Sequence, residues 1–284
     1  TTMRKEGMYK DHRHPEEVDW TNVVEEDLAR RDFTVNAIAL SVDEKLVDPY
    51  KGAVDIKDKL IRAVGDPAKR FQEDALRLMR AIRIATELEF EIDQKTFLAI
   101  KENADSIKEI AWERIRDELF KILASVNPRL PSPDGEASGG QAYQLIIKLR
   151  EAELLQIILP ELEKCFGIQQ MGPKHDRVYD IGEHCLLTLK YCPSSDTITR
   201  LAALLHDIGK PDTTKTESDG NVTFYNNDFV GGEIAKKIAK RFNLSKLQED
   251  KLYRLVRWHL FTVVEKQTDS AIRRFIKNVG VENI

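Results

Sequence analysis

The stretch from Phe71 to Arg83, FQEDALRLMRAIR, constrains the fold more than any other part of this chain. Its apolar residues recur every three or four positions, as in an amphipathic helix with one face in a core. The opposite face carries a narrow stripe of charged side chains: Arg70, Glu73, Arg77 and Arg80. Carboxylates beside guanidinium groups on a rigid helix can read a nucleobase edge and hold phosphates. The same spacing is also typical of a solvated, salt-bridged helix face. This stretch alone therefore does not distinguish a nucleotide-binding face from an ordinary exposed one.

Composition narrows the class of protein. With 284 residues, 42% of them hydrophobic, the chain can bury a core and is expected to form more than one domain. Because the net charge is only -4, any nucleic-acid surface has to be a local patch. Three cysteines without a CxxC pair predict a reduced, cytoplasmic protein. No membrane-length apolar run or signal peptide is recognisable, so no membrane partner is expected, and the oligomeric state stays open.

The pattern of elements predicts a mainly α chain with a small α/β part. Residues 35–42 and 45–47 alternate as two strands, and Asp66-Pro67 is a strong helix start. Helices are expected at 67–89, 93–103, 111–125, 142–157, 178–191, 195–208, 228–242, 245–263 and 268–279. A Pro/Gly/Ser-rich insert at 127–140 and a short ribbon at 213–225 interrupt the helices.

Three more motifs accompany the first one. They are EDLARRDFTVNA at 26–37, VDPYKGAVDI at 47–56 and WERIRDELFKI at 112–122. Together and in this order, the four motifs resemble the RRDFTxNA, DPxxGxxDI, EDxxRxxRxxR and ERIRxEL patterns of class II tRNA nucleotidyltransferases and bacterial poly(A) polymerases. The resemblance implies the remnant of a polymerase-β-like nucleotidyltransferase head, a helical neck for nucleobase recognition, an insert with a helical connector, and a helical HD-type domain. We expect these domains at 1–63, 64–126, 127–165 and 166–284.

The resemblance also implies a nucleotide site made of seven charged residues. They are Arg31, Asp32, Glu73, Asp74, Arg77, Arg80 and Arg83. Arg31 and Asp32 stand where the family binds the ribose and the triphosphate. Glu73, Asp74 and Arg77 stand where it reads the base of CTP or ATP without a template, and the last two arginines continue toward the phosphates.

The catalytic carboxylates of this family lie in an Asp-x-Asp strand upstream of the position of Thr1. They hold the Mg²⁺ ions that orient the attacking 3′-hydroxyl and neutralise the triphosphate. We therefore expect an N-terminally truncated chain that transfers nothing by itself. Its gene product is expected to add C and/or A to the tRNA 3′ end from CTP and ATP. Whether it adds CCA, CC, A or a poly(A) tail stays open.

A second motif lies in the C-terminal part, where LAALLHDIGKP at 201–211 places His206 and Asp207 at the end of an apolar helix. With His184, this resembles the H…HD pattern of HD-domain phosphohydrolases, in which His and Asp side chains bind a divalent metal. The resemblance implies the metal ligands His184, His206, Asp207 and Asp269, with His259 as another candidate for a later ligand. Mn²⁺, Ni²⁺ or Mg²⁺ suits such a ligand set.

Asn227 departs from the HD pattern, because the family usually has a histidine there. Metal binding and hydrolysis at this site therefore stay open. The alternative function is a metal-dependent phosphohydrolase acting on nucleotides or RNA 3′ ends, and a third is a non-catalytic RNA-binding remnant. Basic pairs on the last helices, near Tyr253 and Trp258, can track an RNA backbone, although a solvated face explains most of them.

Overall fold

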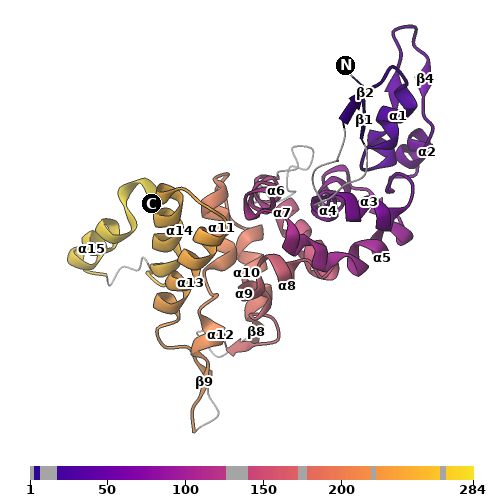
Figure 1. Ribbon diagram of the computed structural model, residues 1–284. Helices are drawn as coiled ribbons and strands as arrows, with labels where there is room; N and C mark the ends of the chain where they lie inside the picture. The colour runs from indigo at the N-terminus through magenta and orange to yellow at the C-terminus, as the bar shows by residue number, and fades with distance from the viewer. Residues whose placement is uncertain (1–2, 7–17, 126–139, 172–177, 219–221, 263–266) are drawn as a thin grey trace. The chain divides into compact units, whose positions relative to one another are not determined.

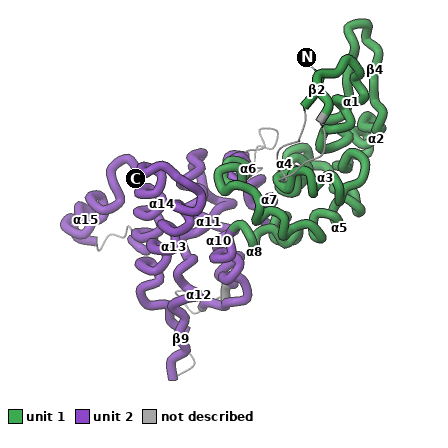
Figure 2. The backbone as a smooth tube through the Cα atoms, in the orientation of Figure 1, with its two compact units in different colours: residues 1–118, 147–158 green, residues 119–146, 159–284 purple. Residues whose placement is uncertain are grey.

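The computed structural model describes residues 3–6, 18–125, 140–171, 178–218, 222–262 and 267–284. The chain forms two compact units, which are drawn in separate colours in Figure 2. Unit 1 comprises residues 1–118 and 147–158, and unit 2 comprises residues 119–146 and 159–284. The two units do not follow the four expected domains one for one. Most of the expected insert at 127–140 lies outside the described residues.

Unit 1 begins with small antiparallel pairs and short helices (Figure 1). Strand β1 (Arg4–Glu6) pairs with β2 (Val18–Trp20), and β3 (Ala39–Leu40) pairs with β4 (Leu46–Val47). The two strands expected at 35–42 and 45–47 are thus present as β3 and β4, but they are shorter than the sequence pattern predicts, and residues 35–36 belong to a 3-10 helix. The helices of this part are α1 (Val24–Ala29), η1 (Thr34–Asn36) and α2 (Gly52–Lys57).

Helices dominate the rest of unit 1, as the sequence predicts. They are α3 (Pro67–Glu73), α4 (Leu76–Leu88), α5 (Gln94–Glu102), η2 (Ala104–Glu109), α6 (Trp112–Ala124), the second half of α7 (Gly140–Glu151) and α8 (Leu155–Ile158). Helix α6 passes into unit 2 after residue 118. A two-residue parallel pair joins β5 (Leu60–Ile61) to β6 (Glu91–Ile92). The apolar positions predicted around the first motif are in the core, with Phe71, Leu78 and Ile82 all 0% exposed.

The single helix expected at 67–89 is wrong, because the chain breaks at Asp74. This residue is extended, with φ -148° and ψ 103°. Its Oδ1 accepts a hydrogen bond from Leu76 N at 3.1 Å, and its Oδ2 accepts one from Arg114 Nη2 at 2.8 Å. An aspartate that bonds a following backbone N–H competes with helix continuation and instead begins a new helix. The N-terminal start is confirmed, since Asp66 caps the amides of Ala68 and Lys69 ahead of α3.

Two of the sequence motifs meet at a tight packing contact in unit 1. Asp48 accepts hydrogen bonds from Gly52 N at 2.7 Å and Ala53 N at 2.9 Å, which fixes the start of α2. A Cβ on Gly52 would lie 2.1 Å from Thr34 O, so only glycine permits this approach. Thr34 Oγ1 also donates to Asp55 Oδ2 at 2.6 Å. The RRDFTxNA and DPxxGxxDI motifs therefore pack against one another and are joined by a hydrogen bond.

Unit 2 is a helical assembly. Helix α13 packs against α14, α14 packs against α11, and α11 packs against α10. Besides the end of α6 and the first part of α7, its helices are α9 (Pro160–Glu163), α10 (Ile181–Lys190), α11 (Thr197–Leu205), α12 (Lys210–Thr213), α13 (Asn227–Arg241), α14 (Lys246–Arg257), α15 (Asp269–Val279) and η3 (Val281–Asn283). Strand β7 (Gln169–Met171) pairs with β8 (Val178–Asp180), and β9 (Lys215–Thr216) pairs with β10 (Val222–Thr223). The latter pair confirms the expected ribbon. Within the described residues, no helix combines the length and the apolarity needed to cross a membrane.

Candidate functional site

Asp32 is the centre of the first candidate site, in unit 1. It follows α1 and is 8% exposed. Its Oδ2 accepts from Arg80 Nε at 2.9 Å, and its Oδ1 accepts from Phe33 N at 3.0 Å and Asn36 Nδ2 at 3.1 Å. Burial works to raise the pKa of Asp32, but the Arg80 guanidinium and these hydrogen bonds outweigh it and hold that pKa below its usual value. The carboxylate is therefore a fixed negative charge that orients Arg80.

Glu73 is the second carboxylate of this site, at the end of α3. Its Oε2 accepts from Arg70 Nη1 at 2.9 Å and from Arg77 Nη1 at 2.5 Å. Arg77 is 8% exposed and also donates to Arg70 O at 3.0 Å and to Arg30 O at 3.2 Å. These bonds tie α3 and α4 to the end of α1, so Arg77 holds the site together from within.

The seven expected nucleotide residues differ in how far a ligand can reach them. The side chains of Arg31, Arg80 and Glu73 are 39%, 33% and 29% exposed. Asp74 and Arg83 instead pair with side chains of α6, Asp74 with Arg114 and Arg83 with Glu118. We therefore distinguish a reachable set, Arg31, Glu73 and Arg80, from residues that support it. We call this set with Asp32 and Arg77 the carboxylate–arginine network.

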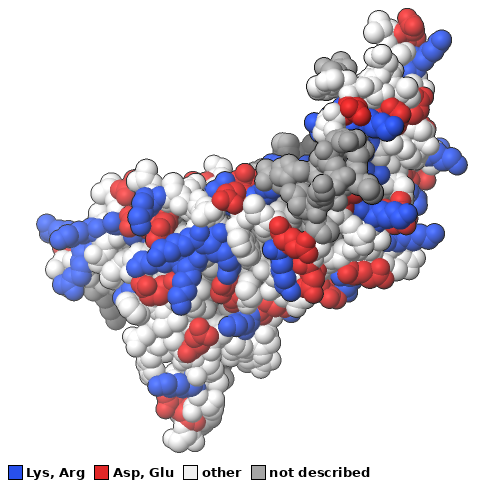
Figure 3. Space-filling view, in the orientation of Figure 1, with Lys and Arg blue, Asp and Glu red and all other residues white. Residues whose placement is uncertain are grey.

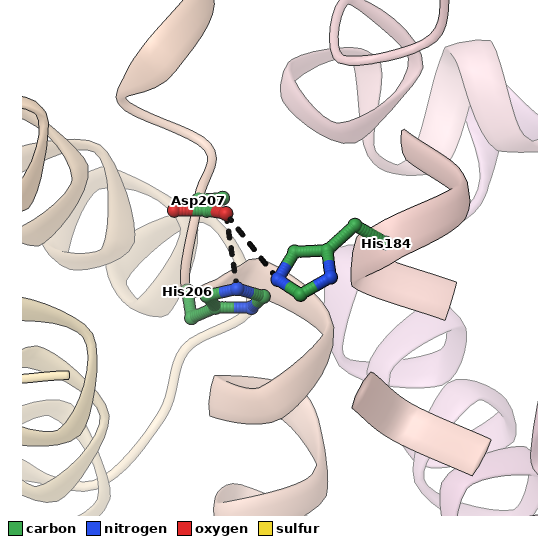
Figure 4. A group of neighbouring side chains, drawn as sticks. All are labelled: His184, His206 and Asp207. Carbon is green, nitrogen blue, oxygen red and sulfur yellow. Dashed lines mark ion pairs between the residues drawn. The ribbon is translucent and has the colours of Figure 1, made fainter. Parts of the chain in front are cut away.

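The second candidate site lies in unit 2, where His184 of α10 meets His206 and Asp207 after α11 (Figure 4). His206 Nε2 lies 3.1 Å and His184 Nε2 lies 3.8 Å from Asp207 Oδ2. One possible ligand atom from each of the three residues lies within 4.8 Å of the others. The Nδ1 of His206 is 2.9 Å from Ala203 O, a contact that fixes a tautomer with the Nε2 lone pair available. Burial and the neighbouring His206 lower the pKa of His184, which favours its neutral, metal-binding form.

His259 completes this group, which we call the His–Asp cluster. Its Nε2 lies 3.3 Å from Asp207 Oδ1, and its Nδ1 lies 2.7 Å from Val256 O. Asp269, the fourth ligand that the resemblance implies, is not brought to these residues. It begins α15 with its side chain 86% exposed and pairs with Arg273 at 3.5 Å. Among the described residues, His259 and not Asp269 is the later candidate that lies beside Asp207.

Unsatisfied polar atoms test whether these residues fit a metal ion. Within the part of the chain that the structure describes, Asp207 Oδ1, Asn227 Oδ1 and His259 Nε2 are buried and make no hydrogen bond, although Asp207 Oδ1 and His259 Nε2 lie 3.3 Å from one another. Buried polar atoms without a partner are unfavourable unless a water or an ion completes them. Imidazole nitrogens with one carboxylate suit a divalent transition metal, so the residues fit.

Lys210 also belongs to this site. Its Nζ lies 2.6 Å from Asp207 Oδ2 and donates to Gln170 Oε1 at 2.6 Å, with the side chain 8% exposed. Burial works to raise the pKa of Asp207, but His206, His259 and Lys210 hold it far below its usual value. The sequence motif HDIGK thus contributes a buried positive charge that helps to keep Asp207 ionised.

Comparison with known proteins places the chain in a family. Sequence models match in order: the poly(A) polymerase head domain at residues 1–62, the probable RNA and SrmB-binding site of polymerase A at 89–130, and the HD domain at 176–276. The chain is 37% identical over 262 residues to the A-adding tRNA nucleotidyltransferase of Deinococcus radiodurans, covering 89% of this chain and 56% of that protein. It is 45% identical over 159 residues to a CCA-adding enzyme of Limosilactobacillus reuteri, covering 56% of this chain and 40% of that protein.

A solved structure agrees with the fold. The apo form II of a CCA-adding enzyme matches with a TM-score of 0.57 and 17% identity, over 100% of this chain and 62% of that one. The fold is therefore that of a nucleotidyltransferase head followed by helical domains. The chain belongs to the family of tRNA nucleotidyltransferases and bacterial poly(A) polymerases, with an HD-type domain in its C-terminal part. It spans about half the length of the curated relatives that it matches.

Proposed function

We propose that the gene product that carries this chain is a template-independent RNA nucleotidyltransferase that adds C and/or A to the tRNA 3′ end from CTP and ATP. The observation that carries the proposal is the carboxylate–arginine network, in which the RRDFTxNA and EDxxRxxR motifs meet through the Asp32–Arg80 pair. The names of the Deinococcus and Limosilactobacillus relatives support the substrate.

Each residue of the network has a role in this proposal. Arg31 and Arg80 contact the triphosphate, because guanidinium groups suit phosphate oxygens and both are reachable. Glu73, with Asp74 and Arg77, presents acceptors and donors toward the base, and Asp32 positions Arg80. Arg83 supports the network from α4 through its ion pair with Glu118 of α6. Mg²⁺, the proposed transfer cofactor, would neutralise the triphosphate and orient the attacking hydroxyl.

Substitution of Arg31 tests this assignment. Arg31→Ala is expected to raise the KM for CTP and ATP together by about tenfold, because one charge-assisted phosphate contact is lost. The assay follows incorporation into tRNA lacking its terminal CCA. Arg116→Ala is the matched control, because Arg116 pairs with Asp117 on α6, outside the network. Absence of any C or A incorporation by the wild-type gene product would overturn the proposed function.

The His–Asp cluster supports a second candidate function, a metal-dependent phosphohydrolase acting on nucleotides or RNA 3′ ends. Its specific support is the buried, unsatisfied Asp207 Oδ1 beside the imidazoles. His184, His206, Asp207 and His259 would hold the ion. A bound divalent ion would polarise a phosphate and lower the pKa of a water.

Metal binding separates the two candidates for the fourth ligand. In calorimetric titrations, His206→Ala is expected to lower the affinity for Mn²⁺ about a hundredfold, and His259→Ala at least about tenfold. These losses are in the range seen when groups around a metal are removed. Asp269→Ala is the internal control and is expected to bind like wild type, because Asp269 is solvent-exposed. The opposite order, with Asp269→Ala weakened and His259→Ala unchanged, would reject our ligand assignment.

Partners and location complete the proposal. Helices α13 and α14, with the turn between them, carry eight Lys or Arg residues against four Asp or Glu, although the whole chain has a net charge of -4. Figure 3 shows basic side chains gathered over these two helices on the face in view. This local excess supports contacts to tRNA phosphates. The three cysteines are free and buried, which supports a cytoplasmic location.

A further inference from the structure

A groove of about 490 Å³ runs along one face of α10 in unit 2. His184, Leu187, Thr188 and Tyr191 line it at positions i, i+3, i+4 and i+7, which fall on the same side of a helix. Ala203 of α11 lines it as well. His184 also belongs to the His–Asp cluster, so the groove and the cluster share this side chain.

The two ends of the groove differ in chemistry. One end is the imidazole of His184, whose Nε2 lies 3.8 Å from Asp207 Oδ2. Away from it the wall is apolar and reachable, with Leu187 40% and Tyr191 51% exposed. Lys190 Nζ lies 5.2 Å from the centre of the Tyr191 ring, so a positive charge stands beside this aromatic surface. In the part of the chain that the structure describes, Lys190 forms no ion pair with an acidic side chain.

We propose that this groove is a nucleoside subsite, in which the base of a nucleoside phosphate stacks on Tyr191 while its phosphate lies at His184 and the cluster. The inference rests on the second proposed function, since it names the ligand of the same cluster. The volume of the groove is that of a small-molecule site. An apolar wall with one polar end favours a ligand that has an apolar part and one polar or charged end. A planar base fits the Leu187–Tyr191 wall, and Lys190 complements the negative charge. A free nucleotide and the terminal nucleotide of an RNA share this chemistry.

Two probes that differ only in the base test the subsite. Adenosine 5′-monophosphate and ribose 5-phosphate are titrated into the full chain with Mn²⁺ present. The signal counted is the part that Asp207→Ala removes, so nucleotide bound by unit 1 is subtracted. We expect the monophosphate that carries adenine to bind at least about tenfold more tightly, because base stacking on an aromatic side chain has this magnitude. Tyr191→Ala is expected to abolish this difference and Tyr191→Phe to keep it, while Mn²⁺ affinity stays unchanged in both.

Equal affinity for the two probes, or an equal loss of both in Tyr191→Ala, would overturn the subsite. If Tyr191→Ala does not fold, Leu187→Trp fills the groove and is expected to block adenosine monophosphate but not ribose 5-phosphate. Competition by a short RNA ending in a 3′-phosphate would assign the site to RNA ends, and its absence would assign it to free nucleotides. Failure of the wild type to bind Mn²⁺ would instead reject the phosphohydrolase function. The experiment does not measure tRNA extension, so it leaves the proposed nucleotidyltransferase function untouched.

Discussion

Replacement of Arg200 by methionine is expected to lower the free energy of unfolding of unit 2 by about 3 to 5 kcal/mol. Arg200 is 0% exposed and lies in α11. Its Nε donates to Ser194 O at 2.6 Å, and its Nη1 donates to Leu123 O at 2.6 Å and more weakly to Ser125 O at 3.5 Å. Methionine has a similar length, so the loss comes from the buried carbonyls that lose a donor. The carbonyls of Leu123 and Ser125 lie at the C-terminal end of α6, where a positive charge is also favourable.

Urea unfolding followed by circular dichroism measures this effect. Arg274→Met is the matched control, because Arg274 is exposed on α15 in the same unit. The control is expected to change the free energy of unfolding by less than about 0.5 kcal/mol. Arg200→Lys should fall between the two, since one ammonium replaces a guanidinium that reaches several carbonyls. A loss below about 1 kcal/mol in Arg200→Met would mean that the buried guanidinium is dispensable.

Local patterns were sufficient to predict most helices of this chain. The 3.6-residue spacing places Phe71, Leu78 and Ile82 in the core, and they are buried. The Asp66-Pro67 start is an interaction between near neighbours, so it is visible in the sequence. The break at Asp74 was not predictable in this way. It depends on Arg114, forty residues later, which fixes the Asp74 carboxylate and which no local pattern announces.

The sites show the same division between local and distant information. The HD motif puts His206 and Asp207 side by side in the sequence, and the structure keeps them together with His184. Which of His259 and Asp269 lies beside Asp207 depends on how the end of α14 and the start of α15 pack. The spacing of residues in the sequence does not determine this packing. The sequence does not indicate the structural role of Arg200 either, because its partners are backbone carbonyls of other segments.

Arg83 offers the sharpest contrast between the family resemblance and the structure. The resemblance directs Arg83 toward phosphates. In the structure, its Nε lies 2.5 Å from Glu118 Oε1 and its Nη1 lies 2.7 Å from Glu87 Oε2, with the side chain 13% exposed. Burial favours the neutral form of Arg83, but the two glutamates outweigh it and raise its pKa. Glu118 itself is 1% exposed, so Arg83 supplies positive charge to a carboxylate deep in unit 1.

Arg83→Met is therefore expected to lower the free energy of unfolding of unit 1 by about 3 kcal/mol, because removing one member of a buried ion pair is strongly unfavourable. The double variant Arg83→Met, Glu118→Gln should recover part of this loss, since the uncompensated carboxylate is gone. Nucleotide binding, measured well below the unfolding temperature, separates the two roles. If Arg83 contacts the phosphates, the Arg83→Met variant would lose CTP affinity while its free energy of unfolding stays unchanged. If Arg83 instead supports Glu118, the variant would lose stability, and its folded fraction would still bind CTP.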